Sequence, residues 1–366
     1  MKIGLITIHH AYNFGASLQS HATYRTLSKL GHEVEFIDYD NNTFLSERQL
    51  FLSFNNLGNI LRNIRTLFQL NQLKTRIHKF ETFYNKYLIS PSHYINNIDW
   101  DTTRYNVILT GSDQTFNLYL TNNPQEMRPF FLENISDKKK VTYASSMGEK
   151  FFKLTNSDEQ WMKEQFLKFN SLSVREKKSA DFIEQLTGVR PQVVLDPTLL
   201  LSADEWNKEV IKSNYEKGEY IAFYTVLSDS WVIKYIEKLS SITRLRVVAL
   251  HQRTRYELGT KFEYAGDIGP GEFLSIIKNA KYVVTTSFHA TCFSIIFKKQ
   301  FVSLIIGEGN RLKSLLSSVG LADRIVTSNS VKEYERVLQN IDFDNSHKMW
   351  QEEKNISMAY LENALK

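Results

Sequence analysis

Three side chains with useful chemistry follow predicted β-strands, at the points where the strand patterns end. Arg175 closes the stretch "LSVRE", Asp113 lies in the turn "GSDQ" after "YNVILT", and His289 follows "VVTTSF". Parallel sheets bind ligands beyond the carboxyl ends of their strands, where helix N-termini and backbone amides meet. There a guanidinium can hold an anion, an imidazole can exchange protons near neutral pH, and a carboxylate can accept hydrogen bonds. Together these residues predict a cleft for a small anion and a polyhydroxylated partner.

Each of these residues also has an ordinary structural explanation. Arg175 could form a salt bridge with Glu176 or another acid, because a buried guanidinium is costly without a counter-charge. His289 could be a core histidine bonded to the backbone, and Asp113 could be a helix N-cap or part of an Asx-turn. Taken singly, the residues leave these alternatives open.

The first half of the chain alternates predicted strands with predicted helices. The opening unit has a strand at 2–8, the loop "HHAYNFGA", a helix at about 17–30 ended by Gly31, and a strand at 33–39. Strand patterns recur at 105–110, 139–149, 171–176 and 192–196, and helical patterns at about 157–169 and 177–187. This alternation predicts a mostly parallel sheet covered on both faces.

A second alternating set begins after Asp196-Pro197-Thr198, where Pro197 forces its predecessor out of helical geometry. Its predicted strands lie at 219–226, 245–250, 281–286 and 300–305, and its helices at about 229–240, 271–279 and 290–298. We therefore expect an α/β protein with two doubly wound, Rossmann-like domains, 1–197 and 198–330, facing each other across a cleft. Residues 331–366 are predicted to form a charged helical tail that packs back on the first domain.

The bulk composition narrows the class of protein. With 42% hydrophobic and 23% charged residues the chain is typical of globular proteins, and no stretch of 18 apolar residues indicates a membrane span. A single cysteine, Cys292, excludes an internal disulfide, and the first residues lack a signal-peptide pattern. We expect a cytoplasmic protein with no nucleic-acid partner.

Dinucleotide cofactors, phosphate loops and metal ions are not expected. The loop Asn13-Phe14-Gly15-Ala16 has one glycine where a dinucleotide fingerprint has three, and no GxxxxGK[ST] motif occurs. Asp38 follows a strand as a ribose-binding acid would, but the signal is weak without the glycines. The adjacent His9 and His10 have no nearby carboxylate set in the sequence, which argues against a metal site.

The segment from Asn42 to Ser90 carries the charge imbalance of the chain. Its seven basic residues minus its two acidic ones give +5, which equals the net charge of the whole chain. Aromatic residues recur in it at helical spacing: Phe51, Phe54, Phe68, Phe80, Phe83 and Tyr84. A helical excursion over 42–100 could rest on anionic lipid, hold an acidic acceptor, or pack its apolar stripe on its own domain. We favour packing, because apolar stripes on helices usually face a core.

Several stretches, in this order and at these separations, resemble the polysaccharide pyruvyl transferase family. They are "HHAYNFGASLQ", "VILTGSDQTFN", "LSVREKKS", "VVLDPTLLL" and "TTSFHATCFSIIF". The resemblance runs from residue 1 to about 325 and is least marked over 42–100. One departure is visible, because the family usually shows Ser-Phe-His-Gly where this chain has Ala290 after His289. That change should tighten the turn slightly without removing the chemistry of the histidine.

The resemblance implies a two-domain fold like that of the GT-B glycosyltransferases. It also implies transfer of the enolpyruvyl group of phosphoenolpyruvate to two hydroxyls of one sugar, which yields a cyclic pyruvate ketal and inorganic phosphate. It places Arg175 and His289 in the donor site. From the chemistry of this donor we assign Arg175 to its anionic groups, with Arg311 as a second candidate. We expect His289 to act as general acid or to protonate the leaving phosphate, and Asp113 to be the base for the sugar hydroxyl. Further expected substrate ligands are Asn13, Gly15, Ser112, Gln114, Ser145, Ser287, Phe288, Asn310 and Arg311.

In this interpretation phosphoenolpyruvate is a co-substrate, and neither a cofactor nor a metal ion is required. The acceptor would be a sugar of a bacterial-type surface polysaccharide or of its lipid-linked precursor. Domain 1–197 would hold the acceptor, and domain 198–330 would contribute to the donor site. Segment 42–90 could then contact the inner face of the cell membrane peripherally.

Two other functions stay open at this point. A glycosyltransferase that uses a nucleotide sugar would share the fold, but would need a base and ribose pocket in the second domain. A non-catalytic member of a polysaccharide-assembly complex would need no site at all. The joint presence of Arg175, His289 and Arg311 argues against the second of these.

Overall fold

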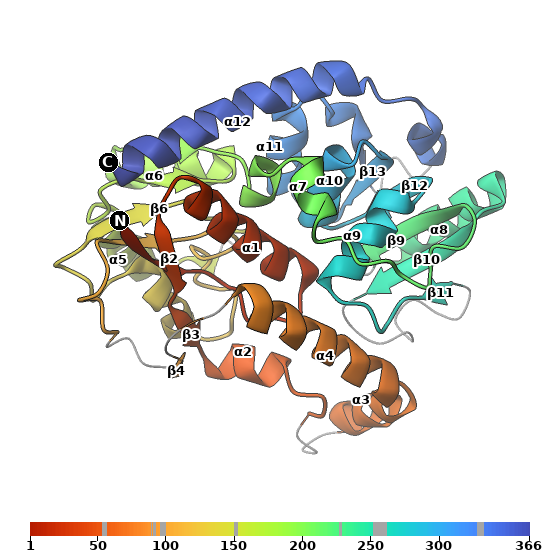
Figure 1. Cartoon of the computed structure of the whole chain (residues 1–366), viewed down its shortest axis with the longest axis horizontal. Helices are drawn as coiled ribbons and strands as arrows, with labels where there is room; N and C mark the ends of the chain where they lie inside the picture. The colour runs from red at the N-terminus through yellow and green to blue at the C-terminus, as the bar shows by residue number, and fades with distance from the viewer. Residues whose placement is uncertain are drawn as a thin grey trace.

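The computed structural model of the chain describes residues 1–52, 57–88, 90, 93–95, 100–149, 153–226, 229–251, 262–327 and 333–366. It shows two parallel sheets, one from each half of the chain, with helices packed against them (Figure 1). The predicted α/β class with two Rossmann-like domains is therefore confirmed.

The first sheet has the order β2-β1-β5-β6, and all its neighbours are parallel. Its strands are β1 (Lys2–Ile6), β2 (Glu33–Phe36), β5 (Val107–Thr110) and β6 (Lys139–Thr142). Isolated parallel bridges from Val141 and Ser145 extend it toward the pair β7 (Ser173–Val174) and β8 (Gln192–Val193). Every residue of β5 is buried, as expected for a central strand covered on both faces.

The helices of this half begin and end at recognisable caps. Helix α1 (Phe14–Lys29) starts a few residues before the predicted position, because the side chain of Asn13 accepts hydrogen bonds from the amides of Gly15 and Ala16. A capping box formed by Thr155 and Asp158 starts α5 (Asn156–Phe166). The remaining helices of this half are η1 (Pro124–Phe131) and α6 (Lys177–Thr187).

The second sheet has the order β11-β10-β9-β12-β13-β14, again with parallel neighbours. Its strands are β9 (Tyr220–Thr225), β10 (Arg246–His251), β11 (Glu263–Tyr264), β12 (Tyr282–Thr285), β13 (Gln300–Ile305) and β14 (Ile325–Thr327). This is the doubly wound order, in which the chain reverses direction across the sheet between β9 and β12 and leaves a crevice there. Strands β11 and β14 were not predicted, since such short strands show no periodicity.

The helices around the second sheet alternate with its strands. They are α8 (Ser230–Thr243), α9 (Pro270–Asn279), α10 (Phe288–Ile296), α11 (Asn310–Ser318), η5 (Ala322–Arg324) and η7 (Glu333–Leu338). Phe273 of α9 stacks on Phe14 of α1 with 4.7 Å between ring centroids. One apolar cluster thus joins both halves of the chain on one side of the crevice.

The connection between the halves runs from β8 to β9 and contains η3 (Pro197–Leu200) and α7 (Ala203–Asn207). The tail helix bridges the two halves. Helix α12 (Phe343–Leu365) then runs from the second half back over the first (Figure 1). The indole of Trp350 donates to the carbonyl of Leu199 at 2.9 Å, and the hydroxyl of Tyr360 donates to the carbonyl of Thr142 at 2.9 Å. These bonds fix the tail against the first half.

A helical insertion leaves the first sheet after β2. It contains β3 (Asp38–Asp40), α2 (Asn42–Glu47), α3 (Leu57–Phe68), α4 (Leu70–Tyr87) and β4 (His93–Ile95). The preferred arrangement, a stripe packed on its own domain, holds for α4, which buries Phe80, Phe83 and Tyr84. It is wrong for α3, whose apolar side chains are exposed. No helix among the described residues is long and apolar enough to cross a membrane.

Candidate active site

A cavity of about 270 Å³ lies between the two halves, at the carboxyl ends of β12 and β13. The N-cap residues of α1, α10 and α11, which are Asn13, Ser287 and Gly309, all line it. The first turn of a helix presents backbone N–H groups without helical partners and the positive end of the helix dipole. This interdomain cavity is therefore built to receive negative charge.

Two glycines permit the close approach of these helices. Gly309 has φ of +63°, and a Cβ there would meet the side chain of Ile305 at 2.4 Å. A Cβ on Gly15 would lie 2.1 Å from Nδ1 of His289. Gly15 therefore acts by leaving room for the histidine of the other domain, and a side chain at this position would displace the ring.

His289 lies in the first turn of α10 and is almost fully buried beside the interdomain cavity. Its Nε2 is 3.5 Å from Oδ2 of Asp196, at the outer limit of a hydrogen bond, and has no closer hydrogen-bond partner among the described residues. Asp196 thus faces the ring without forming a short hydrogen bond to it. The predicted role of His289 in proton transfer stays a prediction.

Asp196 and Arg175 form a buried ion pair beneath the cavity. Nη1 of Arg175 lies 2.6 Å from Oδ2 of Asp196, and Nη2 lies 3.4 Å from Oδ1 of Asp113. The guanidinium also covers the ring of Phe288 at 4.3 Å. The arginine therefore has its salt bridges with Asp196 and Asp113 rather than with Glu176. Its predicted contact with an anionic donor stays a prediction, because its charge is already compensated.

The charges of this pair determine its titration. Burial acts to raise the pKa of Asp196, but the neighbouring His289 and Arg175 outweigh it and hold that pKa well below its usual value. Burial likewise opposes the charged form of Arg175, and the carboxylates of Asp196 and Asp113 nevertheless raise its pKa. Both groups are thus ionised at neutral pH.

Arg311 differs from Arg175 in having no such partner. It lies in the first turn of α11 and lines the interdomain cavity. Within the described part of the chain it forms no ion pair, and its buried Nε has no hydrogen-bond partner. Burial, and then the positive charge of Arg175, lower its pKa from the usual value. A cation in this setting is a ready ligand for an anion.

The predicted substrate ligands fall into three groups. Lining the interdomain cavity are Asn13, Asp113, Gln114, Ser287, Phe288, His289 and Arg311. Beneath its walls lie Gly15, Ser112, Ser145 and Arg175, of which Ser112 and Ser145 are fully buried and bond to neighbouring chain. Asn310 is not among the lining residues, and its amide donates to Glu308 at 2.7 Å. Ser112, Ser145 and Asn310 thus have local structural partners.

Asp196 was missed by sequence reasoning, which used the Asp-Pro-Thr stretch only as a break between domains. Its Oδ1 accepts from the amide and hydroxyl of Thr198 at 3.0 and 2.7 Å, which caps η3. Its Oδ2 faces Arg175, His289 and the hydroxyl of Ser112. The available signal was a carboxylate at the end of a strand, the same position that identified Asp113.

A second cavity, of about 500 Å³, adjoins the first under the helical insertion. Asn13, Asp113 and Gln114 line both cavities, so the two are neighbours that share a wall. Arg48, Arg62 and Arg76 give this insertion cavity a basic wall. Arg76 is buried and stacks on the ring of Phe14 at 4.8 Å, and burial lowers its pKa.

The expectation that no carboxylates lie near His9 and His10 is wrong. Within the described residues, His10, Asp38 and Asp40 bring potential ligand atoms within 4.8 Å of one another. Protein groups already contact each of them. Nε2 of His10 lies 3.5 Å from Glu81, Nε2 of His9 lies 3.1 Å from Asp38, and Arg48 forms an ion pair with Asp40. Strands β1 and β2 pair in parallel, so the segments that follow them, which carry these histidines and aspartates, lie side by side. Sequence spacing does not reveal this proximity.

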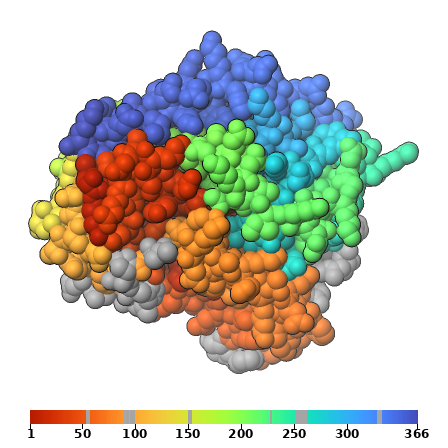
Figure 2. All heavy atoms as spheres, in the orientation of Figure 1, coloured from red at the N-terminus to blue at the C-terminus, as the bar shows by residue number. Residues whose placement is uncertain are grey.

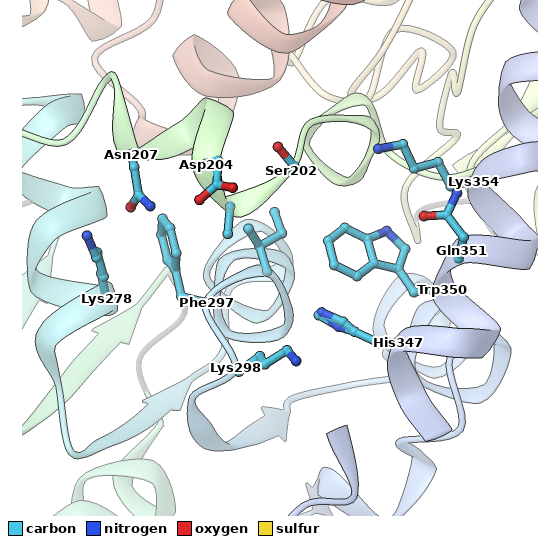
Figure 3. A pocket seen from close by; sticks show the side chains of 12 residues that line it. Ser202, Asp204, Asn207, Lys278, Phe297, Lys298, His347, Trp350, Gln351 and Lys354 are labelled. Carbon is cyan, nitrogen blue, oxygen red and sulfur yellow. The ribbon is translucent and has the colours of Figure 1, made fainter. Parts of the chain in front are cut away.

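A larger hollow of about 600 Å³ opens on another face, between α7, α10 and α12 (Figure 3). Lys278, Phe297 and Lys298 line it from the carboxyl ends of α9 and α10. Helix C-termini carry the negative end of the dipole, and the carboxyl ends of the strands lie elsewhere. Despite its size, this hollow lacks the groups that gather at the interdomain cavity.

Solved structures with a similar fold come from sugar-nucleotide enzymes. The UDP-GlcNAc 2-epimerase of Methanocaldococcus jannaschii, in complex with UDP-GlcNAc and UDP, has 12% identity and a TM-score of 0.52 over 92% of each chain. The UDP-N-acetylglucosamine 2-epimerase of Rickettsia bellii has 10% identity and a TM-score of 0.55 over 100% of this chain and 96% of its own. HepE of Anabaena, in complex with UDP and glucose, has 10% identity and a TM-score of 0.51 over 98% of this chain and 94% of its own. Such identities establish the GT-B fold alone.

The sequence comparison is more specific. A search of curated proteins gave no match. The polysaccharide pyruvyl transferase family, by contrast, matches residues 13–307, which include Asn13, Asp113, Arg175, Asp196 and His289. These are the residues that the fold gathers at and beneath the interdomain cavity. The chain belongs to the polysaccharide pyruvyl transferase family.

Proposed function

We propose that the protein transfers the enolpyruvyl group of phosphoenolpyruvate to two hydroxyls of one sugar in a surface polysaccharide or its lipid-linked precursor. The observation that carries the proposal is the interdomain cavity, where Arg311 and the N-termini of α1, α10 and α11 meet. Phosphoenolpyruvate bears a phosphate and a carboxylate, and both are anions that such groups bind.

The size of the cavity favours this donor over a nucleotide sugar. Pockets that enclose a drug-sized ligand measure roughly 300–1,000 Å³. The interdomain cavity, at about 270 Å³, falls just below that range. A nucleotide sugar would have to extend beyond the walls of the interdomain cavity, whereas phosphoenolpyruvate would fit within them.

The reaction needs one acid, one base and an anion clamp. A proton delivered to the methylene carbon of phosphoenolpyruvate makes C2 electrophilic, and a deprotonated sugar hydroxyl forms the first C2–O bond. The bond from C2 to phosphate then breaks, and the second hydroxyl closes the ketal and releases its proton. In this proposal His289 is the acid, Asp113 is the base, and Arg311 holds the donor's anionic groups. Arg175 and Asp196 position the acid and the base.

The acceptor would enter through the insertion cavity. This cavity of about 500 Å³ is large enough for a sugar and meets the interdomain cavity at Asn13, Asp113 and Gln114. Asp113 thus stands where an acceptor hydroxyl would meet the donor. The basic wall formed by Arg48, Arg62 and Arg76 suits an acceptor that carries phosphate.

The test is to incubate the protein with phosphoenolpyruvate and a panel of soluble and lipid-linked glycans. Phosphate release, together with the mass gain of a pyruvate ketal, is the expected result. His289→Ala and Arg311→Ala should abolish it, whereas His347→Ala and Arg190→Ala, which change residues away from the cavity, should not. If only UDP- or GDP-sugars raise the melting temperature and phosphoenolpyruvate does not, a glycosyltransferase is the better assignment.

A further inference from the structure

Helix α3 buries two uncharged polar residues and exposes most of its apolar ones. Asn63 and Thr66 are buried, at 3% and 4% exposure. Its exposed apolar side chains are Leu57 (78%), Leu61 (56%), Ile64 (45%), Leu67 (57%) and Phe68 (76%), and Arg62 and Arg65 are exposed as well. A surface helix of a soluble domain normally shows the reverse, and a contiguous exposed apolar face marks a site of interaction.

Specific hydrogen bonds hold the helix in this orientation. The side-chain amide of Asn63 donates to the carbonyl of Leu52 at 2.9 Å and accepts from the amide of Leu52 at 2.9 Å. Turning the apolar face inward would break both bonds and expose Asn63. The outward direction of the leucines is thus built into the insertion.

The outward face is a continuous stripe with basic edges. Leu57, Leu61, Ile64 and Phe68 are spaced by four, three and four residues, so they lie along one side of the helix, over a length of about 16 Å. Arg65, which is next to Ile64 in the sequence, is exposed beside the stripe, and Lys74 is exposed on the following helix, α4. Helix α3 carries no acidic residue. The insertion protrudes at the lower edge of the molecule (Figure 2).

We infer that α3 docks on an anionic lipid bilayer, with its apolar stripe inserted among the acyl chains and its basic flank on the headgroups. Charge complementarity selects this occupant. An apolar stripe beside basic residues is the composition of helices that lie in a membrane interface. A second copy of the chain, docked by twofold symmetry on the same stripe, would bring the basic flanks of the two copies together at a cost.

The position of α3 links this surface to the proposed reaction. Arg62 and Thr66 of the same helix line the insertion cavity. A headgroup anchored in the bilayer could therefore reach that cavity while its lipid chains stayed in the membrane. This second step rests on the proposed function, whereas the docking itself does not.

Vesicle binding without phosphoenolpyruvate tests the docking directly. The full chain should co-sediment with phosphatidylcholine vesicles that contain phosphatidylglycerol, and much less with phosphatidylcholine alone or at high salt. The variant L61D/F68D should lower the partition coefficient by about tenfold or more. The matched variant L167D/V189D, at exposed apolar positions that follow α5 and α6, should leave it unchanged.

A fluorescent probe reports insertion without removing the stripe. Cys292 is fully buried, so a cysteine introduced by Phe68→Cys can be labelled selectively with an environment-sensitive dye. Its emission should shift to the blue with anionic vesicles, and the same label at Leu167→Cys should not respond. No shift at position 68, or equal binding by L61D/F68D, would overturn the inference. So would a dimer in light scattering that L61D/F68D dissociates while vesicles leave the wild-type chain unbound.

The outcomes separate this inference from the proposed function. L61D/F68D changes no residue of either cavity, so turnover of a water-soluble acceptor should be that of the wild type. Loss of vesicle binding with that turnover intact supports docking whatever the natural acceptor is. Vesicle binding without any pyruvyl transfer would instead leave docking standing and remove the proposed function.

Discussion

Arg175 and Arg311 come from opposite sides of the same cleft, and the protein treats their charges in opposite ways. Arg175 is enclosed by carboxylates, with Asp196 at 2.6 Å and Asp113 at 3.4 Å. Arg311 lines the cavity with no ion pair among the described residues. One guanidinium is thus part of the framework, whereas the other has no counter-charge in contact with it among the described residues. An arginine at a strand or helix end can therefore be identified as a candidate ligand only once its neighbours are known.

The largest effect should come from removing the counter-charge of Arg175. Asp196→Ala leaves a buried guanidinium without its main partner, and breaking a buried pair in this way costs about 3–5 kcal/mol of unfolding free energy. Urea denaturation at pH 7 measures this loss. Asp181→Ala, which removes one member of the exposed pair with Arg190, should have little effect. A small loss in Asp196→Ala would show that Arg175 finds another partner or water.

Removal of the proposed acid should impair catalysis and spare the fold. His289→Ala should lower kcat by about 100-fold or more, the usual contribution of a general acid. The melting temperature should fall by less than in Asp196→Ala, because the imidazole has no short hydrogen bond to lose, although its removal leaves a small cavity. His347→Ala provides the matched control at the hollow of Figure 3. If His289→Ala kept wild-type turnover, a residue other than His289 would have to supply the proton.

The two arginines themselves should respond differently to the same substitution. Arg311→Gln should raise KM for phosphoenolpyruvate about tenfold, because a charge-assisted hydrogen bond contributes about 1.5–3 kcal/mol. Its melting temperature should change little, since a half-buried cation that forms no ion pair among the described residues is removed. Arg175→Gln should instead lower the melting temperature, because Asp196 loses its partner. Equal thermal losses in the two variants would remove the distinction between them.

The smallest effect concerns pH. The pKa of Asp196 is depressed in the folded protein, so its stabilising contribution is present above about pH 3.9, the usual pKa of an unfolded aspartate, and is lost as pH falls through the lower folded value. The difference in unfolding free energy between the wild type and Asp196→Asn should therefore still be present in full at pH 5. It should narrow below about pH 4. Urea denaturation across this range measures it, and a difference that grows with acidity would reverse the sign.

The sequence predicted where the candidate site lies better than which of its residues are exposed to the cavity. The strand-end rule brought Asp113 and His289 correctly to the lining of one cavity. It gave the same weight to Ser112 and Ser145, which are sealed beneath the surface, because a pattern of strands does not show which residue of a loop faces outward. Asp196 was missed because Pro197, which follows it, was interpreted only as a domain boundary. Contacts between segments distant in the sequence determine which of these residues are buried and which reach the cavity.

The insertion shows the same limit of periodicity. Both α3 and α4 carry apolar residues at helical spacing, and this spacing identifies a stripe without saying which way it points. Helix α4 turns its stripe toward α1, where Phe80 stacks on Phe14 at 5.3 Å. Helix α3 is turned the other way by the bonds between Asn63 and Leu52. A single polar contact thus overrides the usual rule.

The close fit of Gly15 against His289 has a mechanical consequence. The glycine belongs to the first helix of one domain and the histidine to the helix after β12 of the other, and the space between them would not admit a methyl group. Any opening of the cleft must therefore separate these residues first, or pivot about them. If the cleft opens for substrate entry by separating them, the proton donor disengages whenever the donor site is open to water. The fold would then couple readiness for proton transfer to domain closure.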